Sequence, residues 1–463
     1  MELAEVKSLI DDGTINYITL GLPDTNGIFR RKHFTGPHFL NSLPRGIPFS
    51  NAMFCWDLAD NWVYPFKLGN IVHLFGDSIL KPDLNTFMVV PWEEHRATCI
   101  GDLYTKQDMP VTISARQILR NVVERARAMG FEPLVAPELE IRFFRENGAS
   151  LRAKDFGSDL VPLHPLSKNY GGSSSSSNDH LIASIASMMQ EYGIDVECFL
   201  TEHAPGMYEL NTKYTDVLTA ADHAMLFKTG IKEIANQQGI MASFMSRWNE
   251  KEDGSSGHVH MSLWDRDRER NLFWDEDAGH GISTTLRHFL AGLLAALPDF
   301  MAIYAPQVNS YKRYLMNFPM QVPVCTTWGI DNRSCSVRVL NNDQRAIRIE
   351  NRVPGADANF YLVFAAMIAS GLYGIERKLE LSAPIKGNAH QVATIDQPLL
   401  KGEIRSLAPN LTAATDMLMR STVAREYLGS DFIEHFTVTR RWEVQQCELV
   451  VSNWERRRCL ELI

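Results

Sequence analysis

The alternation of apolar and polar residues divides the chain into two regions near Pro110. In the first region, short β-like runs are separated by turn-rich sequence. These runs predict strands over residues 16–21, 54–58, 70–75 and 86–90. We therefore expect a small β-rich domain over residues 1–108.

The second region shows helical spacing. Ser114 and Gln117 have the spacing of a capping box, apolar residues follow at intervals of three and four, and Gly130 ends the pattern. Longer patterns of the same kind predict helices over 215–238 and 359–379. Strand patterns alternate with these helices, so we expect one large mixed domain over residues 109–463.

Composition excludes several classes of protein. The chain has 463 residues, 45% of them hydrophobic, which is enough for a large core, and its net charge of −9 argues against nucleic-acid or anionic-membrane binding. The longest apolar run, Phe289–Leu297, is too short to span a membrane, and the N-terminus does not resemble a signal peptide. Seven scattered cysteines without CxxC spacing favour a reducing, cytoplasmic location. The Gly/Ser-rich segment 171–178 predicts a flexible surface loop, or a mobile loop near a polyanion.

Acidic residues in three segments are the first candidate chemistry. In the predicted strand 137–144, alternation places Glu138 and Glu140 on one face, where the two carboxylates repel unless a cation lies between them. Glu202 and Glu209 flank a tight turn. Glu350 lies between Arg348 and Arg352 on one strand face. A solvated strand face and a structural salt-bridge ladder are the alternative interpretations.

Two histidines complete this candidate set. A Gly/Ser turn precedes a strand with His258 and His260 on one face, and both could equally be core histidines. Together the segments offer many oxygen ligands and few nitrogen ligands, which suits Mg²⁺ or Mn²⁺ and therefore phosphate chemistry. Interspersed arginines can grip phosphate or carboxylate groups. The chain has neither a Walker A motif nor a GxGxxG fingerprint.

The order of motifs along the chain resembles that of the glutamine synthetase family. The motifs are PELEIRFF, EHAPGMYEL, DGSSGHVHMSLWD, VNSYKR, WGIDNRSCSVRV and RIENRVPGADANFYLVFAAM. The resemblance implies an α+β protein, with an N-terminal β-grasp domain and a catalytic domain in which packed helices accompany an antiparallel sheet lining a funnel-shaped site. It also implies a homo-oligomer of two stacked hexameric rings, a dodecamer, with active sites at subunit interfaces.

The resemblance also implies roles for individual residues. Two divalent ions would be held by Glu138, His258 and Glu350 and by Glu140, Glu202 and Glu209. ATP would contact His260, Ser262, Arg338 and Arg348. Glutamate would contact Gly254, Arg313 and Arg352, and Arg313, Arg333 and Arg352 match residues that grip its carboxylates or the transferred phosphoryl group. The implied reaction makes an acyl phosphate from glutamate and ATP, which an amine then attacks.

Departures from the family pattern concern the amine. Gln321 occupies the position of a flap glutamate that helps ammonia-using members deprotonate ammonium, which favours the branch that joins glutamate to organic amines. Asp57 is the nearest match to the aspartate that a neighbouring subunit contributes to ammonium binding. The aromatic segment 56–66 could form an apolar amine pocket or a strand of the small domain. An ammonia-using enzyme and a non-catalytic relative remain alternatives, and the sequence does not identify the amine.

Overall fold

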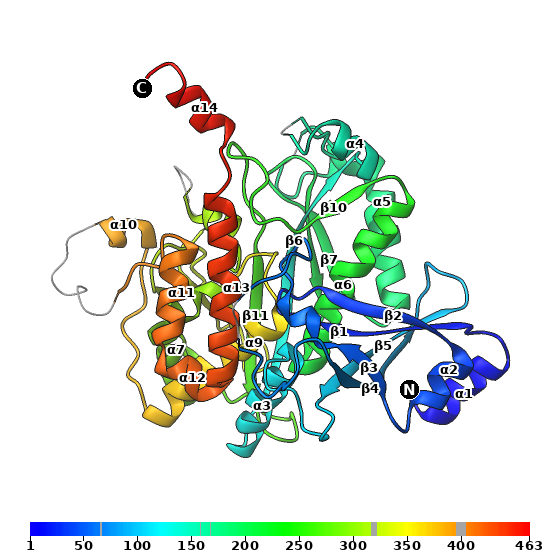
Figure 1. Ribbon diagram of the computed structural model, residues 1–463. Coiled ribbons are helices and arrows are strands. Elements are labelled where there is room, and N and C mark those ends of the chain that lie inside the picture. Colours follow the sequence, from blue (N-terminus) through cyan, green and yellow to red (C-terminus); the bar gives the residue numbers. More distant parts are fainter. Residues whose placement is uncertain (65–66, 158, 167, 316–321, 395–403) are drawn as a thin grey trace.

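The small N-terminal region is built around a curled five-stranded sheet (Figure 1). A computed structural model describes residues 1–463 except 65–66, 158, 167, 316–321 and 395–403. The sheet has the order β2-β1-β5-β4-β3, in which β1 and β5 are parallel and the other pairs are antiparallel. Its strands are β1 (Tyr17–Pro23), β2 (Phe29–Thr35), β3 (Ile47–Ser50), β4 (Asp77–Val89) and β5 (Arg96–Tyr104). Helices α1 (Leu3–Asp11) and α2 (Gly36–Ser42) complete the region.

Two of the four strands predicted here are wrong. The strand predicted over 16–21 is confirmed by β1, and the one over 86–90 overlaps the end of β4. Residues 54 and 55 instead end the 3-10 helix η1 (Asn51–Cys55), Trp56 makes only an isolated bridge to Trp62, and residues 70–75 lie in turns and irregular backbone. Phe54 and Ile71 are buried in the small core, so their burial produced an apolar pattern without a β-ladder. A short apolar run in a sequence does not distinguish a β-strand from another buried segment.

The large region contains a second sheet with β6 (Glu132–Phe144) at its centre. Its strand order is β12-β13-β14-β11-β6-β8-β7, and the short strands β9 and β10 also pair with β6. The other strands are β7 (Val196–Thr201), β8 (Met207–Thr212), β9 (Thr215–Asp216), β10 (Met241–Ser243), β11 (Gly257–Trp264), β12 (Trp328–Ile330), β13 (Val337–Leu340) and β14 (Arg348–Asn351). The β12–β13 pair is parallel, so the expected antiparallel sheet is a mixed one.

The predicted long helices pack together beside this sheet. They are α3 (Ala115–Ala128), α6 (Val217–Gln237) and α9 (Phe360–Arg377). Gly130 has a φ of 87° and ends the α3 segment as expected, but the Ser114 side chain makes no capping hydrogen bond. Nearly every α9 residue is buried, and α9 contacts α3, α6 and α7 (Thr284–Ala296). These elements confirm the α+β class.

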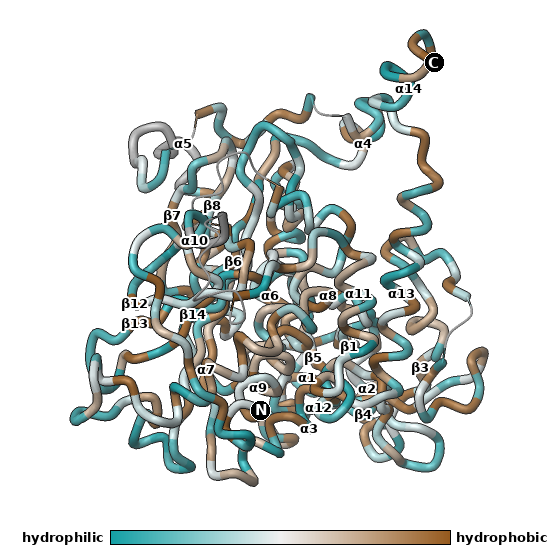
Figure 2. Tube along the Cα trace, turned by 90° about the vertical axis from the view of Figure 1, so that its left-hand side faces the viewer, coloured by the Kyte–Doolittle hydropathy of each residue, from teal (hydrophilic) through white to brown (hydrophobic). Residues whose placement is uncertain are grey.

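The remaining helices surround this core. They are α4 (Gly148–Ala153), α5 (Gly172–Glu191), α8 (Met301–Tyr304), α10 (Ala389–Thr394), α11 (Leu411–Arg420), α12 (Thr422–Leu428), α13 (Ser430–Glu448), α14 (Asn453–Cys459) and the 3-10 helices η2 (Gly279–Gly281), η3 (Leu297–Phe300) and η4 (Asn309–Tyr314). The Gly/Ser segment predicted as a loop begins α5, which corrects that prediction. Helix α14 projects away from the body in both views (Figures 1 and 2).

One apolar helical stretch passes the length and composition test for a membrane span. This stretch, Thr284–Tyr304, is 72% buried over its most apolar window. Its α7 part packs against α9 in the large core. The structure therefore gives this stretch the role of a core segment. All seven cysteines are free thiols.

A buried arginine joins the small sheet to the helices of the large region. Arg116, on α3, donates to Asp83 and Asp102 of the small sheet and to Asp222 of α6 at 2.7–2.9 Å. Tyr361 of α9 donates to the same Asp222 at 2.6 Å. Because one buried cation serves carboxylates from both regions, it fixes how the small sheet lies against α3 and α6. The division at residues 108 and 109 stays a prediction.

Candidate active site

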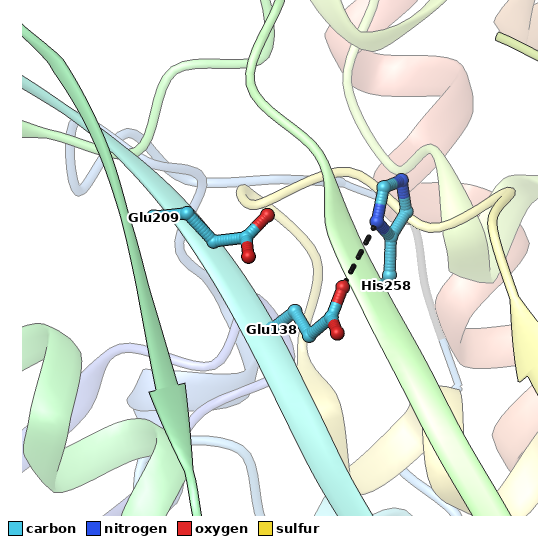
Figure 3. A group of neighbouring side chains, drawn as sticks. All are labelled: Glu138, Glu209 and His258. Carbon is cyan, nitrogen blue, oxygen red and sulfur yellow. Dashed lines mark hydrogen bonds and ion pairs between the residues drawn. The ribbon is translucent and has the colours of Figure 1, made fainter. Parts of the chain in front are cut away.

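The acidic side chains predicted to form the site converge on one face of the central sheet. On β6, Glu138 lies opposite His258 of β11, and Glu140 lies opposite Glu209 of β8. Alternate residues of a strand share a face, so Glu138 and Glu140 project together while Leu139 and Ile141 enter the core. Figure 3 shows the side chains of Glu138, Glu209 and His258 pointing toward one another.

Three overlapping groups of these side chains have the spacing of metal ligands. In each group the potential ligand atoms lie within 4.8 Å of one another. The groups are Glu138, Glu209 and His258; Glu138, His260 and Glu350; and Glu140, Glu202 and Glu209. The structure thus brings all six predicted ligands together and adds His260. Five carboxylates and two imidazoles form a donor set that fits Mg²⁺ or Mn²⁺.

Crowding of the carboxylates raises several pKa values. Burial, followed by the charge of Glu202, raises the pKa of Glu140 to about 7. Burial and the charges of Glu138 and Glu140 raise the pKa of Glu209 to about 8. Glu202 also has a raised pKa, again chiefly through burial. A bound cation would relieve this repulsion by replacing the protons.

Glu138 behaves differently because two imidazoles face it. Burial acts to raise its pKa, but hydrogen bonds from His258 and His260 hold the pKa well below its usual range. His260 Nε2 lies 2.6 Å from Glu138 Oε1, and His260 Nδ1 lies 3.1 Å from Arg348 Nε. Since arginine can only donate, His260 Nδ1 accepts and Nε2 donates to Glu138. In this arrangement His260 orients Glu138, and His258 is the better ligand.

Only part of the predicted arginine row contacts Glu350: Arg352 does, whereas Arg348 donates to His260 Nδ1 and to the carbonyl of Ala346. The Glu350 carboxylate is 1% exposed and accepts hydrogen bonds from Arg338, at 3.1 Å, and from Arg352. Burial acts to raise the pKa of Glu350, but the charge of Arg352 lowers it overall. Arg352 also donates to the carbonyl of Arg333 at 3.0 Å, while the Arg333 side chain is exposed. Glu350 thus forms the kind of salt bridges that the sequence left open as an alternative, and its carboxylate also belongs to one of the candidate metal-ligand groups.

The residues that the resemblance assigns to glutamate define one end of the site, which we call the glutamate end. It lies where η4 meets the turn before β11. Arg313 is buried and donates to Ser256 Oγ at 3.2 Å and to the carbonyl of Val353. Gly254 lies against it, because a Cβ at this glycine would come within 2.8 Å of Arg313 Cγ and 2.5 Å of Ser246 O. The structure therefore brings into contact Gly254 and Arg313, two of the residues that the resemblance assigns to glutamate.

A cavity of about 500 Å³ opens at the other end of the acidic cluster. Among the predicted ATP residues, His260, Ser262 and Arg348 line it, whereas Arg338 does not appear among its lining residues. Sequence reasoning missed Tyr214 and Trp264, which supply aromatic walls. Tyr214 follows the β8 segment that carries Glu209, so its position next to a predicted ligand was the available signal.

Two residues were predicted to act at the amine-binding end of the site, and the structure describes only one of them. Gln321 lies outside the described residues. Asp57 is buried, and its carboxylate accepts hydrogen bonds from Asn61 and from Trp442 Nε1 at 3.0 Å. Burial acts to raise the pKa of Asp57, but these hydrogen bonds lower it. Asp57 is thus held within its own chain by four hydrogen bonds, two of them from the backbone of Ala59 and Asn61.

The neighbouring aromatic segment forms no strand of the small sheet in its described part. Trp62 stacks on Tyr64 at 5.8 Å between ring centroids and contacts Phe75 at the same distance. These three side chains are 37%, 54% and 80% exposed. The structure therefore contradicts the strand interpretation and leaves an exposed aromatic surface beside Asp57.

Comparison with known proteins identifies the family. Residues 112–459 match the family described as glutamine synthetase, catalytic domain. The chain is 37% identical, over 100% of its length and 98% of the relative, to a glutamate–isopropylamine ligase from a Pseudomonas species. It is 34% identical, over 99% of its length and 95% of the relative, to a γ-glutamylethanolamide synthetase from Streptomyces coelicolor.

Structural likeness extends over the same length. The solved structure of a GmaS–ADP complex superimposes with a TM-score of 0.84, 25% identity and coverage of 98% of this chain and 99% of that one. A glutamine synthetase from Thermotoga maritima is 32% identical over the whole length of both chains. The chain belongs to the glutamine synthetase family, and it is an ATP-dependent, ADP-forming ligase of glutamate.

Proposed function

We propose that this enzyme joins the γ-carboxylate of glutamate to an organic amine through γ-glutamyl phosphate. The observation that carries the proposal is the acidic cluster on β6, β8, β11 and β14, which lies between an aromatic-walled cavity and the Arg313–Gly254 contact. A nucleotide in the cavity and glutamate at the opposite end would meet at the cluster, where phosphoryl transfer requires charge neutralisation.

The described residues have separate tasks in this proposal. Glu138, His258 and Glu350 hold one divalent ion, and Glu140, Glu202 and Glu209 hold the other. Such ions, when bound, supply positive charge beside the phosphates. His260, Ser262, Arg338 and Arg348 contact ATP. Arg313, Arg352 and Gly254 orient glutamate, and the exposed Arg333 reaches the transferred phosphoryl group.

The chemistry then proceeds in two displacements. The γ-carboxylate of glutamate attacks the γ-phosphorus of ATP, the bond to the β–γ bridging oxygen breaks, and ADP leaves. The amine nitrogen next attacks the acyl carbon, phosphate leaves with the electrons of the C–O bond, and the nitrogen loses a proton. Water must be excluded in between, because it would hydrolyse the acyl phosphate.

Two observations support an organic amine over ammonia. Gln321 cannot attract a cation or accept its proton, as a flap glutamate can. The exposed aromatic side chains of Trp62, Tyr64 and Phe75 offer apolar area, and burial of apolar groups contributes about 25 cal/mol per Å². One relative named for an isopropylamine substrate and one named for an ethanolamide product agree with this branch.

Assembly is part of the proposal. The aromatic surface and Asp57 would complete the amine end of a site on a neighbouring subunit, in a dodecamer of two hexameric rings. The small domain, residues 1–108, would then pack against the catalytic domain, residues 109–463, of the next chain. Light scattering tests this: a monomer with full activity at micromolar concentration would contradict it.

Phosphate release tests the amine. Glutamate, ATP and Mg²⁺ or Mn²⁺ are supplied with ammonium, methylamine, isopropylamine, ethanolamine, aniline or putrescine at pH 7.5, with a correction for each protonated fraction. We expect kcat/KM for an organic amine to exceed that for ammonia at least about tenfold, equivalent to ~1.4 kcal/mol. Gln321→Glu should move the preference toward ammonia. If ammonia wins in the wild type, the enzyme is an ammonia-using glutamine synthetase.

A further inference from the structure

One carboxylate outside the acidic cluster connects two segments of the glutamate end. Asp357 lies in the loop between β14 and α9, and its two oxygens have different partners. Ser246 Oγ donates to Oδ1 at 2.8 Å, and Ser310 Oγ donates to Oδ2 at 2.5 Å. Ser246 precedes the turn that contains Gly254, and Ser310 lies on η4, which carries Arg313. A single side chain therefore bridges the two segments that meet at the Gly254–Arg313 contact.

Backbone bonds continue the connection toward the acidic cluster. Ser255 N donates to Ser246 O at 2.8 Å, and Ala356 N donates to Ser255 O at 3.2 Å. The next residue, Ser256, donates its N–H to the Glu140 carboxylate and receives a hydrogen bond from Arg313. The loop of Asp357 thus supports the backbone that faces both glutamate and a proposed metal ligand.

A lysine fixes the loop itself. Lys228, on α6, donates from Nζ to the carbonyl of Ala356 at 2.7 Å and to that of Ala358 at 3.2 Å. These carbonyls flank Asp357 in the sequence, so the Lys228 side chain orients the loop through its two hydrogen bonds. Space around the bridge is tight: a Cβ at Gly355 would overlap Asp357 Oδ1 and come within 2.5 Å of Ser246 Oγ.

We propose that Asp357 is a positioning residue for glutamate: by holding Ser246 and Ser310 together, it sets the separation of Gly254 and Arg313. The inference rests on the proposed function. It predicts that disturbing the bridge weakens glutamate use and leaves nucleotide use intact, because the residues that line the nucleotide cavity include none from segments 246–256, 309–314 or 352–359. A role in general stability alone would predict parallel losses.

Kinetics separate these alternatives. In Asp357→Ala we expect KM for glutamate to rise at least about tenfold, since small misplacements of binding groups are costly, while KM for ATP stays within about twofold. Asp357→Asn retains one acceptor and offers one donor, which a serine hydroxyl can accept, so it should restore most of the loss. Equal rises in both KM values, or no rise, would overturn the proposal.

Milder variants protect the test against misfolding. Gly355→Ala pushes a methyl group into the bridge and should reproduce the glutamate-specific effect at smaller size. Gly279→Ala is the matched control, because a Cβ there meets nothing within 4 Å; it should behave as wild type. If Gly355→Ala matches Gly279→Ala in both KM values, the bridge does not position glutamate.

Binding measurements distinguish failure of this inference from failure of the proposed function. Isothermal titration of wild type and variants with glutamate and, separately, with ADP is carried out in the presence of Mn²⁺. Wild-type protein that binds glutamate but forms no amide would contradict the function, and the glutamate affinity of Gly355→Ala would still decide the role of Asp357. Wild-type protein that binds no glutamate would overturn both.

Discussion

Replacement of Glu140 by glutamine tests the electrostatic account of the acidic cluster directly. Glu140 is 8% exposed, and the charge of Glu202 adds to the effect of burial. Its carboxylate accepts a hydrogen bond from the Ser256 N–H. Glutamine has nearly the same shape and retains an acceptor oxygen. Glu140→Gln therefore removes a charge while preserving the main local contact.

The sign and size of the effect follow from the pKa. The ordinary pKa of 4.5 rises to about 7 in the folded protein, so the folded state holds this proton more tightly than the unfolded state. Stability is therefore lost as pH rises from about 4.5 to about 7. At 1.36 kcal/mol per pKa unit, the ionised group costs the metal-free protein about 3 kcal/mol above pH 7. Glu140→Gln should recover up to this amount at pH 8 and almost none near pH 4.5.

Urea unfolding in EDTA at pH 5 and pH 8 measures this difference. The exposed Glu94→Gln serves as the control and should shift neither midpoint. Addition of Mn²⁺ at pH 8 should stabilise wild type strongly and Glu140→Gln weakly, since the variant lacks a charged ligand. The reasoning is refuted if the variant gains no stability at pH 8 relative to pH 5, or if Mn²⁺ stabilises both proteins equally.

Three further outcomes are expected. Mn²⁺ affinity should increase between pH 6 and pH 8, with proton release in calorimetry, because protons on Glu140 and Glu209 compete with the ion below pKa values of about 7 and about 8; a flat profile would contradict this. Glu138→Ala and Glu350→Ala should each abolish turnover and leave the circular-dichroism spectrum intact, whereas turnover at saturating Mn²⁺ in both would exclude their metal role. Tyr214→Ala should raise KM for ATP about tenfold through lost stacking, with KM for glutamate unchanged.

The parts that sequence predicted well depend on local periodicity. Alternation along β6 gave the common face of Glu138 and Glu140, and helical spacing with Gly130 gave α3 to within a residue or two. Both features are fixed by backbone geometry over a few residues. The same logic failed at Phe54 and Ile71, because burial alone produced the pattern there.

The parts that sequence missed depend on distant segments. The carboxylate of Asp57 is occupied by Trp442, 385 positions later in the chain. Asp357 gained its role from serines 111 and 47 positions away. Of the two aromatic walls of the candidate nucleotide cavity, Trp264 lies in a quoted motif without a role assigned to it, and Tyr214 lies outside the motifs. The periodicity of a sequence carries no information about contacts between distant segments, so a structure was required to find these contacts.

The central position of β6 has a consequence for how this enzyme can change over evolutionary time. One strand carries a ligand of each proposed metal group and is hydrogen-bonded to β8 and β11, which carry most of the others. Inserting or deleting a single residue before Glu138 would exchange every inward and outward side chain and destroy both groups at once. Under the proposed function, a new amine would therefore be accommodated by substitutions in the loops and on the exposed aromatic surface, where a change leaves the strand register intact. The range of substrates can therefore change during evolution, while the sequence of the phosphoryl-transfer centre tolerates almost no change.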